Sequence, residues 1–225
     1  MFRKLLIATV IIIGLAILAF WSPWQQWDFS ITSILGIESK DEFSALKVKS
    51  LGGTLEVFVD GQSFGETSAD EDFLEVFPVE PGEHTVRLVR KADADYTEIV
   101  RKINFEPAVD VIIGYEIGPN EQFSEGHILY ARRSFTAQGD PGVEVYSSPE
   151  KVNVQLDGQD IGQTPLKDIA LTTDRKHTLA FSKPGYDPLE IEILPENQAD
   201  RDKLKNMILT LEINLFAQPV RIVEQ

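Results

Sequence analysis

The chain has 225 residues, of which 43% are hydrophobic and 25% are charged, and this globular composition excludes wholesale disorder. Its 36 acidic and 21 basic residues leave a net charge of -15, which argues against nucleic acid as a partner, because a phosphate backbone needs clustered cations. The sequence contains no cysteine, which excludes disulfides, thiol catalysis, cysteine-ligated zinc and a lipid anchor on cysteine.

The N-terminal segment has the pattern of a membrane anchor. Residues 1–4 include Arg3 and Lys4, and an uncharged, strongly apolar run follows them. As a helix, residues 5–24 would span about 30 Å, the thickness of a bilayer's hydrocarbon core. All three tryptophans, Trp21, Trp24 and Trp27, follow the run, where amphipathic rings suit the headgroup level. We therefore predict a transmembrane anchor over residues 5–24 and a short cytoplasmic tail over residues 1–4.

Two alternatives to an uncleaved anchor are a cleaved secretory signal and a buried core helix. The apolar run is longer than the roughly 7–15 residues typical of a signal, and no pair of small residues suited to cleavage follows Leu18. The uncleaved anchor is the favoured interpretation. It predicts a single-pass protein of the cell membrane, with its N-terminus in the cytoplasm and its C-terminal domains outside.

Residues 25–43 form a predicted juxtamembrane linker. Trp24, Trp27, Ile31, Ile34 and Leu35 fall at near-helical spacing, which fits a short helix lying on the outer membrane surface. A loosely ordered linker with a few apolar contacts explains the same pattern equally well.

An internal repeat organises the remaining chain. Residues 57–67 recur as residues 154–164 at an offset of 97, and residues 84–88 match residues 177–181 at an offset of 93. The repeat predicts two tandem domains, at residues 44–136 and 142–225.

Both repeats have the pattern of β-structure. Apolar and polar residues alternate over residues 55–59, 85–88, 152–156 and 189–193, and sustained helical periodicity is absent after residue 40 except near residues 198–205. The Asp60-Gly61 and Asp157-Gly158 pairs are typical of tight hairpin turns. We therefore predict an all-β fold, with two tandem small β-sandwiches behind an N-terminal transmembrane helix.

Residues 148–186 resemble the PEGA domain. The resemblance rests on Ser148-Pro149, the Asp-Gly turn, Gly162-Gln-Thr-Pro-Leu and Lys183-Pro-Gly-Tyr, in that order. The first repeat resembles the family less closely, because Thr67 lacks the following Pro-Leu and the Lys-Pro-Gly-Tyr segment is replaced. The resemblance implies small β-sandwich modules of prokaryotic surface proteins, which serve as binding or spacer modules and have no general catalytic activity.

Residue patterns that suggest catalysis have simpler explanations. Residues 61–65 match the G-x-S-x-G pattern around Ser63, but an Asp-Gly hairpin precedes them and no amphipathic helix follows. His84 and His177 occupy equivalent positions, which indicates a shared structural role, and His127 is predicted to lie alone in a loop. We expect no enzymatic activity and no transition-metal site.

The acidic residues suggest a further possible site. Between residues 50 and 86 the chain has nine acids and no lysine or arginine, and Asp70, Glu71 and Asp72 are consecutive. A solvated acidic face explains this stretch, and weak Ca²⁺ binding or a cationic partner is the alternative, although no calcium-loop spacing is present.

These observations favour a membrane-anchored envelope protein that displays its β-sandwiches for protein interaction or adhesion. The alternative is a passive structural stalk or assembly subunit of the cell surface. A carbohydrate-binding module is weakened because no tryptophan follows residue 27 to stack on sugar rings, although tyrosine and phenylalanine could substitute.

Overall fold

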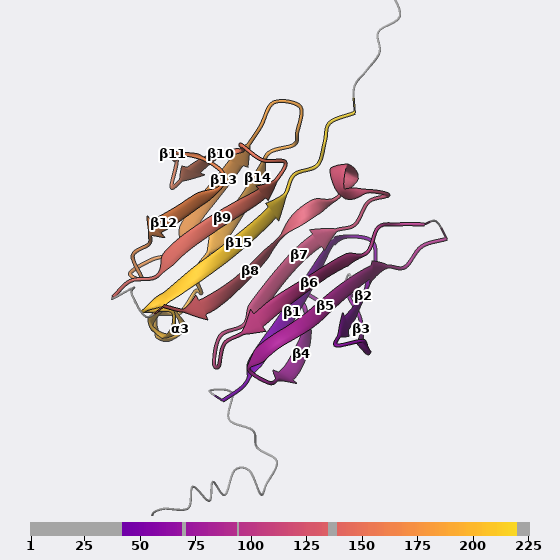
Figure 1. Ribbon diagram of the computed structural model, residues 1–225, viewed down its shortest axis with the longest axis horizontal. Helices are drawn as coiled ribbons and strands as arrows, with labels where there is room; N and C mark the ends of the chain where they lie inside the picture. The colour runs from indigo at the N-terminus through magenta and orange to yellow at the C-terminus, as the bar shows by residue number, and fades with distance from the viewer. Residues whose placement is uncertain (1–41, 69–70, 94, 135–138, 220–225) are drawn as a thin grey trace, which may run out of the picture. The chain divides into compact units, whose positions relative to one another are not determined.

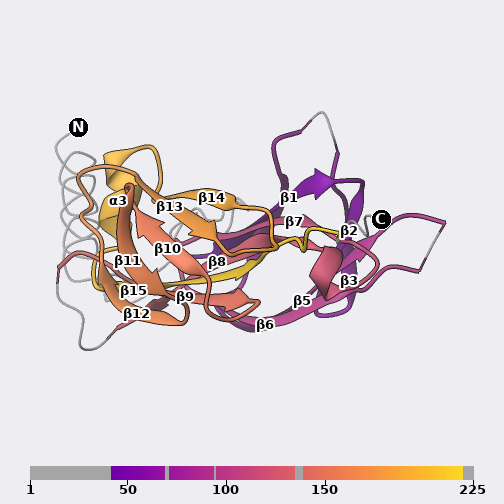
Figure 2. The same cartoon turned by 90° about the horizontal axis from the view of Figure 1, so that it is seen from above.

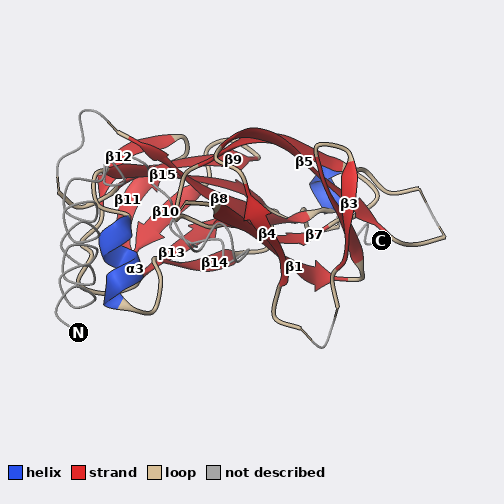
Figure 3. Ribbon diagram, turned by 90° about the horizontal axis from the view of Figure 1, so that it is seen from below, coloured by secondary structure: helices blue, strands red, loops and turns tan. Residues whose placement is uncertain are grey.

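The computed structural model describes residues 42–68, 71–93, 95–134 and 139–219 (Figure 1). These residues form fifteen strands in three sheets, one short α-helix, α3 (Gln198–Lys203), and a 3-10 turn, η2 (Glu121–Phe123), as Figure 3 shows. The predicted all-β class is confirmed. The predicted tail, the anchor over residues 5–24 and most of the juxtamembrane linker lie outside the described residues. Among the described residues, no helix has the length and apolar character needed to cross a membrane.

The two repeats contribute matching sets of strands. The first seven are β1 (Ser44–Gly52), β2 (Leu55–Val59), β3 (Gln62–Glu66), β4 (Leu74–Val79), β5 (Gly82–Arg90), β6 (Ile99–Phe105) and β7 (Val111–Glu116). Their counterparts are β9 (Gly142–Ser148), β10 (Asn153–Leu156), β11 (Gln159–Gln163), β12 (Leu166–Ala170), β13 (His177–Ser182), β14 (Leu189–Ile193) and β15 (Met207–Asn214). One further strand, β8 (Glu125–Arg133), lies between the two sets in the chain and has no counterpart among the described residues.

A single seven-stranded sheet joins the two predicted domains. Its order is β12-β9-β15-β8-β7-β1-β4, so the second repeat supplies one side and the first repeat the other. Within each repeat the first and last strands pair in parallel, β1 with β7 and β9 with β15. The additional strand β8 pairs antiparallel with both β7 and β15. The repeats therefore share a continuous backbone hydrogen-bond ladder through β8.

The two smaller sheets cover opposite faces of the seven-stranded sheet. Their orders are β3-β2-β5-β6 and β11-β10-β13-β14. On β8, Ile128 belongs to the first repeat's core and the alternate residue Ala131 belongs to the second repeat's core. Because neighbouring residues of a strand point to opposite faces, the two cores lie on opposite sides of β8. Figure 2 shows β13 and β14 on one side of the central sheet and β5 and β6 on the other. An approximate twofold axis along β8 relates the repeats.

Each repeat buries its own apolar core between its small sheet and its half of the large sheet. The first core centres on Leu46, Leu55, Leu88, Phe105 and Ile113, and the second on Val145, Leu171, Leu179, Phe181 and Leu211, all at most 1% exposed. The predicted pair of sandwich-like cores is present, and the shared sheet joins them.

The repeated sequence motif forms the same turn in both repeats. Asp60 and Gly61 have φ angles of 50° and 81°, and Asp157 and Gly158 have φ angles of 50° and 80°. Positive φ at both central residues is the geometry of the primed hairpin turn that the Asp-Gly pairs predict.

The environment of His127 differs from the prediction. We predicted a loop, whereas His127 lies within β8 and pairs with Gly114 of β7. A Cβ atom at position 114 would lie 2.6 Å from Cε1 of His127, so the absence of a side chain on Gly114 makes room for the imidazole. Alternation is hard to recognise in β8 from sequence because both faces of this strand pack against apolar residues.

Candidate functional site: two grooves beside the shared strand

The acidic residues predicted as a possible ligand site do not assemble into a described one. Asp70 lies outside the described residues, and Glu71 and Asp72 are exposed. The nearest cation to Asp72 is Lys49, whose Nζ lies 3.8 Å from Oδ1. Within the described ranges, no three histidine, cysteine or acidic side chains come together as a metal site would require.

Ser63 lies on strand β3, in a hairpin, and not on the strand-to-helix turn of a nucleophile elbow. Its Oγ donates a hydrogen bond to Oε1 of Glu56 at 2.8 Å. The G-x-S-x-G pattern therefore belongs to the hairpin geometry of the repeat.

His84 and His177 make the same contacts in the two repeats. Nδ1 of His84 lies 2.6 Å from Oδ2 of Asp60, and Nδ1 of His177 lies 2.8 Å from Oδ2 of Asp157. The other ring nitrogen of each histidine faces a backbone carbonyl oxygen. The predicted shared structural role is thereby explained, since each histidine ties the Asp-Gly turn to the start of the neighbouring strand.

The aspartates of these turns are held ionised. The backbone N–H of Thr85 and then His84 lower the pKa of Asp60, and Thr178 and then His177 lower the pKa of Asp157. A carboxylate that accepts these hydrogen bonds is stabilised in its charged form. Both turns therefore contain an aspartate that is ionised at neutral pH.

Two grooves follow from the arrangement of the sheets. Each small sheet covers only its own half of the large sheet, so the other half leaves a face open beside β8. The edge strand of a small sheet borders each open face: β6 borders the face formed by β15 and β9, and β14 borders the face formed by β7 and β1. The approximate twofold axis relates the two open faces, but the grooves form at different levels on them, because Glu212 lines the polar groove and its equivalent Gly114 does not line the apolar groove.

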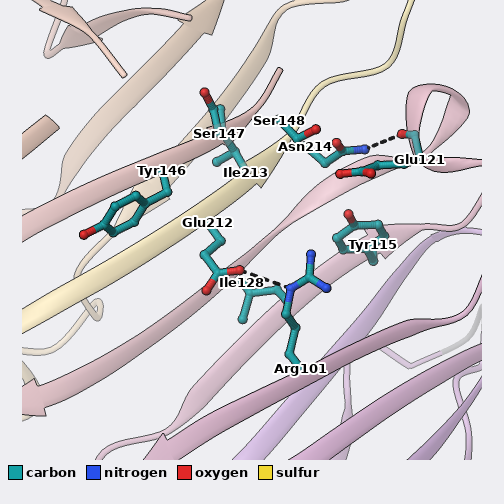
Figure 4. Close-up of a pocket in the computed structure, with 10 residues that line it drawn as sticks. All are labelled: Arg101, Tyr115, Glu121, Ile128, Tyr146, Ser147, Ser148, Glu212, Ile213 and Asn214. Atoms are coloured by element: carbon teal, nitrogen blue, oxygen red, sulfur yellow. Dashed lines mark hydrogen bonds and ion pairs between the residues drawn. The ribbon is translucent and has the colours of Figure 1, made fainter. Parts of the chain in front are cut away.

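The polar groove lies between β6 and the open face of β15 and β9, has a volume of about 200 Å³, and is shown in Figure 4. Its side chains include Arg101, Tyr115, Glu121, Tyr146, Ser148, Glu212 and Asn214. Nε of Arg101 lies 3.2 Å from Oε2 of Glu212, and the Tyr130 hydroxyl donates to Oε1 of Glu212 at 3.1 Å. These contacts connect the first repeat, β8 and the second repeat.

Backbone contacts fix the end of the polar groove near η2. The Asn214 amide on β15 donates hydrogen bonds to the backbone oxygens of Glu121 and Ser124, at 2.8 and 2.5 Å. The Asn120 side chain caps η2 by accepting a hydrogen bond from the backbone N–H of Phe123. Glu121 is thereby held at the rim of the groove.

The tyrosines of this region are poor acids. Burial raises the pKa of Tyr115 to about 12, and burial together with the negative charge of Glu212 raises the pKa of Tyr130 to about 12. Both phenols therefore keep their protons at neutral pH, and the phenol of Tyr130 donates its proton to Glu212 in a hydrogen bond.

The apolar groove lies beside β14 and α3 on the open face of β7 and β1, and has a volume of about 560 Å³. Its apolar side chains include Phe73, Ile112, Leu129, Leu194, Leu204 and Leu209. Phe73 is 40% exposed, which is unusual for a phenylalanine.

The charged side chains around the apolar groove are paired with one another. Nζ of Lys47 lies 2.6 Å from Oδ2 of Asp110. Nζ of Lys176 contacts Glu192 at 2.7 Å and Glu196 at 2.6 Å. The walls of the groove therefore carry paired charges, from three lysines and four acids, around its apolar side chains.

Sequence reasoning did not identify either groove. Arg101, Tyr115 and Glu212 are far apart in the chain, and they meet only because β8 joins the two repeats. One difference between the repeats could have pointed to the polar groove. The register of the parallel pairs makes Gly114 on β7 equivalent to Glu212 on β15, so an acid stands in one repeat where the other has glycine.

Comparison with known families gives a match between the PEGA domain and residues 141–207, from just before β9 to the first residue of β15. No curated protein and no solved structure matches the chain significantly. The matched segment includes the motifs on which the resemblance was based. The recognition of the second repeat as a PEGA domain, a β-rich domain of extracellular and surface proteins, is thereby confirmed.

Proposed function

We propose that the chain is a single-pass, membrane-anchored protein of the cell envelope that binds another protein through the apolar groove. The predicted anchor over residues 5–24 and the family match support the location. The observation that carries the binding function is the apolar groove itself, where Phe73 is exposed and Ile112 and Leu129 are half-buried. Removal of this apolar surface from water by a partner would be favourable.

The chemistry of the groove favours an uncharged apolar segment of a partner. Each lysine of the wall already contacts at least one acid, so a charged side chain entering the groove would lose its hydration to meet charges that are already paired. A volume of about 560 Å³ accommodates several apolar side chains. The partner segment is therefore one that presents neighbouring aliphatic or aromatic residues.

The edges of the seven-stranded sheet offer a poorer binding surface. Edge strand β4 contains Pro78, which lacks a backbone donor, and edge strand β12 has an irregular register between Leu166 and Ile169, with Asp168 at a φ of 57°. Such features are typical of edges protected against added strands. Partner binding by strand addition is therefore disfavoured.

Site-specific cross-linking in the native membrane tests this proposal. A photoreactive benzoylphenylalanine replaces Phe73 in the full chain, and the matched control carries it at Phe64, which is equally exposed (42% against 40%) and lies outside both grooves. We expect one discrete cross-linked product from position 73 and none from position 64. Absence of a product at both positions would instead support a passive stalk.

The proposed location has its own test. The protein should fractionate with membranes, resist extraction by carbonate or high salt, and lose its folded part to protease added from outside. Recovery of a soluble species that lacks the first twenty-odd residues would overturn the anchor and leave the groove proposal intact.

A further inference from the structure

The hydroxyl of Tyr115 is unusual because it is placed in the polar groove without a partner. Tyr115 is only 3% exposed and its ring belongs to the first repeat's core. Its hydroxyl makes no hydrogen bond to any described residue and is not fully buried, so it reaches the water in the groove. In Figure 4 the hydroxyl points in the direction of Glu121 and Asn214. The groove therefore contains an unused, pre-positioned donor.

The carboxylate of Glu121 is an unused acceptor in the same groove. Its backbone oxygen is held by Asn214, but its side chain makes no hydrogen bond or ion pair within the described part of the chain. An exposed carboxylate satisfies itself with water and can exchange that water for a ligand at little cost.

Arg101 provides a second donor. Its Nε contacts Glu212 and its Nη1 donates to the backbone oxygen of Val100 at 3.0 Å, whereas Nη2 has no partner among the described residues. The contacts of Nε and Nη1 hold the planar guanidinium in place, so Nη2 is oriented before any ligand arrives.

A ligand for this groove must both donate and accept hydrogen bonds. An ammonium or guanidinium group could satisfy Glu121 but would leave the donors of Tyr115 and Arg101 unused. An anion would meet two carboxylates, those of Glu121 and Glu212, against the single guanidinium of Arg101. Hydroxyl groups donate and accept at once, and a sugar residue carries several of them on a rigid ring.

From this geometry we infer that the polar groove binds a neutral sugar residue through hydrogen bonds from Tyr115 and Arg101 and to Glu121. A volume of about 200 Å³ suits a single sugar ring. Recognition by hydrogen bonds to an already ordered set of polar groups does not require a stacking tryptophan, which the described part of the chain lacks. The site is separate from the apolar groove, so either proposal can fail without the other.

Calorimetric titration of the full chain in detergent micelles tests the inference. The neutral probes are glucose, galactose, mannose and N-acetylglucosamine, with cellotetraose and chitotetraose as chain forms, and the charged controls are glucuronic acid and glucosamine. We expect saturable binding of at least one neutral sugar, with weaker binding of the charged controls. Tighter binding of a tetrasaccharide than of its monomer identifies a glycan chain as the source, and equal binding identifies a single residue.

The decisive variant is Tyr115→Phe, which removes only the unpaired hydroxyl and keeps the buried ring. We expect it to weaken sugar binding by about tenfold, the effect of one hydrogen bond in a ready-made site. Its Tm should equal or exceed that of the wild type, because the lost hydroxyl has no hydrogen-bond partner among the described residues. The matched control, Tyr96→Phe, lies outside the groove and should bind as the wild type does. Binding by Tyr115→Phe at wild-type affinity, or no saturable binding of any neutral sugar, would overturn the inference.

Discussion

The two grooves lie on opposite faces of the large sheet and at different levels along its strands, and one is small and polar whereas the other is larger and more apolar. The repeats agree in strand order, in the Asp-Gly turn and in the histidine that holds it. The repeats differ in the strands that pair with β8, which are β7 and β15. Where β15 presents Glu212 to the polar groove, the equivalent residue of β7 is Gly114, which presents no side chain. The comparison shows that duplication preserved the cores and left the open faces free to diverge.

The alternation of β8 directs neighbouring residues to the two faces of the large sheet. Tyr130 points to the face of the polar groove, where its hydroxyl meets Glu212, and its neighbour Leu129 lies in the apolar groove. Strand β8, which has no counterpart among the described strands, thus supplies Ile128 to the polar groove and Leu129 to the apolar groove. The same strand packs against both cores, so substitutions in β8 are expected to have the largest effects on stability.

Truncation of Ile128 is expected to have the largest effect. Its side chain is 2% exposed in the first repeat's core, so Ile128→Ala should lower the free energy of unfolding by about 2–5 kcal/mol through lost burial and an unfilled cavity. Because β8 is hydrogen-bonded to both repeats, we expect both repeats to unfold in one transition. Urea unfolding monitored by circular dichroism measures this transition.

The control for this variant is Val100→Ala on β6. Val100 is 47% exposed, so its truncation should change the free energy of unfolding by no more than about 0.5 kcal/mol. Two separate transitions, only one of which moves in Ile128→Ala, would show that the repeats are independent domains.

The pH dependence contributed by His127 should be the next largest effect. Burial lowers its pKa to about 4, and Nδ1 of the ring has no hydrogen-bond partner in the described structure. In the unfolded chain this histidine has an ordinary pKa near 6.5. At pH values between the two pKa values, the unfolded chain therefore binds a proton at this residue and the folded chain does not. Stability from this residue is therefore present at pH 7 and is lost as the pH falls, by roughly 2 kcal/mol between pH 7 and pH 5.

His127→Gln isolates this contribution. Burial, followed by the charges of Asp187 and Glu116, raises the pKa of the neighbouring Glu125, which favours the folded state as the pH falls and so opposes His127. The variant keeps Glu125, and hence the difference between wild type and variant reports His127 alone. Urea unfolding at pH 7, 6 and 5 should show that the wild type loses more stability than His127→Gln, and parallel pH profiles would contradict the assignment.

The sequence predicted the features that each repeat carries within itself. Alternation located β2, β5, β10 and β14, and positive φ at Gly61 and Gly158 was predicted because Asp-Gly pairs favour primed turns. The short helix near residues 198–205 was also predicted and is present as α3. These features are set by interactions between residues close in the chain.

The sequence did not predict how the two repeats pair with each other. The pairing of β8 with β15 joins His127 to Ile213 and Tyr130 to Thr210, and no local pattern specifies such a register. Both faces of β8 pack against other residues, so its sequence lacks the alternation of polar and apolar residues by which a strand is recognised. The polar groove was not predicted for the same reason, since Arg101, Tyr115 and Glu212 come from β6, β7 and β15, respectively.

The smallest expected effect concerns the acidic connection, where the repeats differ in length. Seventeen positions separate Thr67 from His84, whereas thirteen separate Thr164 from His177, and the shorter connection closes the second repeat. The acids of the longer one are therefore not required for closure. Replacing Asp70, Glu71 and Asp72 together by Asn, Gln and Asn should change the free energy of unfolding by no more than about 0.5 kcal/mol, because the described members, Glu71 and Asp72, are exposed.

Melting curves of the wild type and this triple variant, with and without millimolar Ca²⁺, distinguish the two interpretations of the acidic stretch. A ligand that binds only the folded state raises its Tm in proportion to occupancy, so calcium binding by these acids would raise the Tm of the wild type and leave the variant unchanged. Equal responses would identify the stretch as a solvated face, because screening of general surface charge acts on both proteins alike. A large loss of stability in the variant without calcium would instead show that the longer connection has a structural role in the first repeat, and the comparison between the two connections would then be wrong.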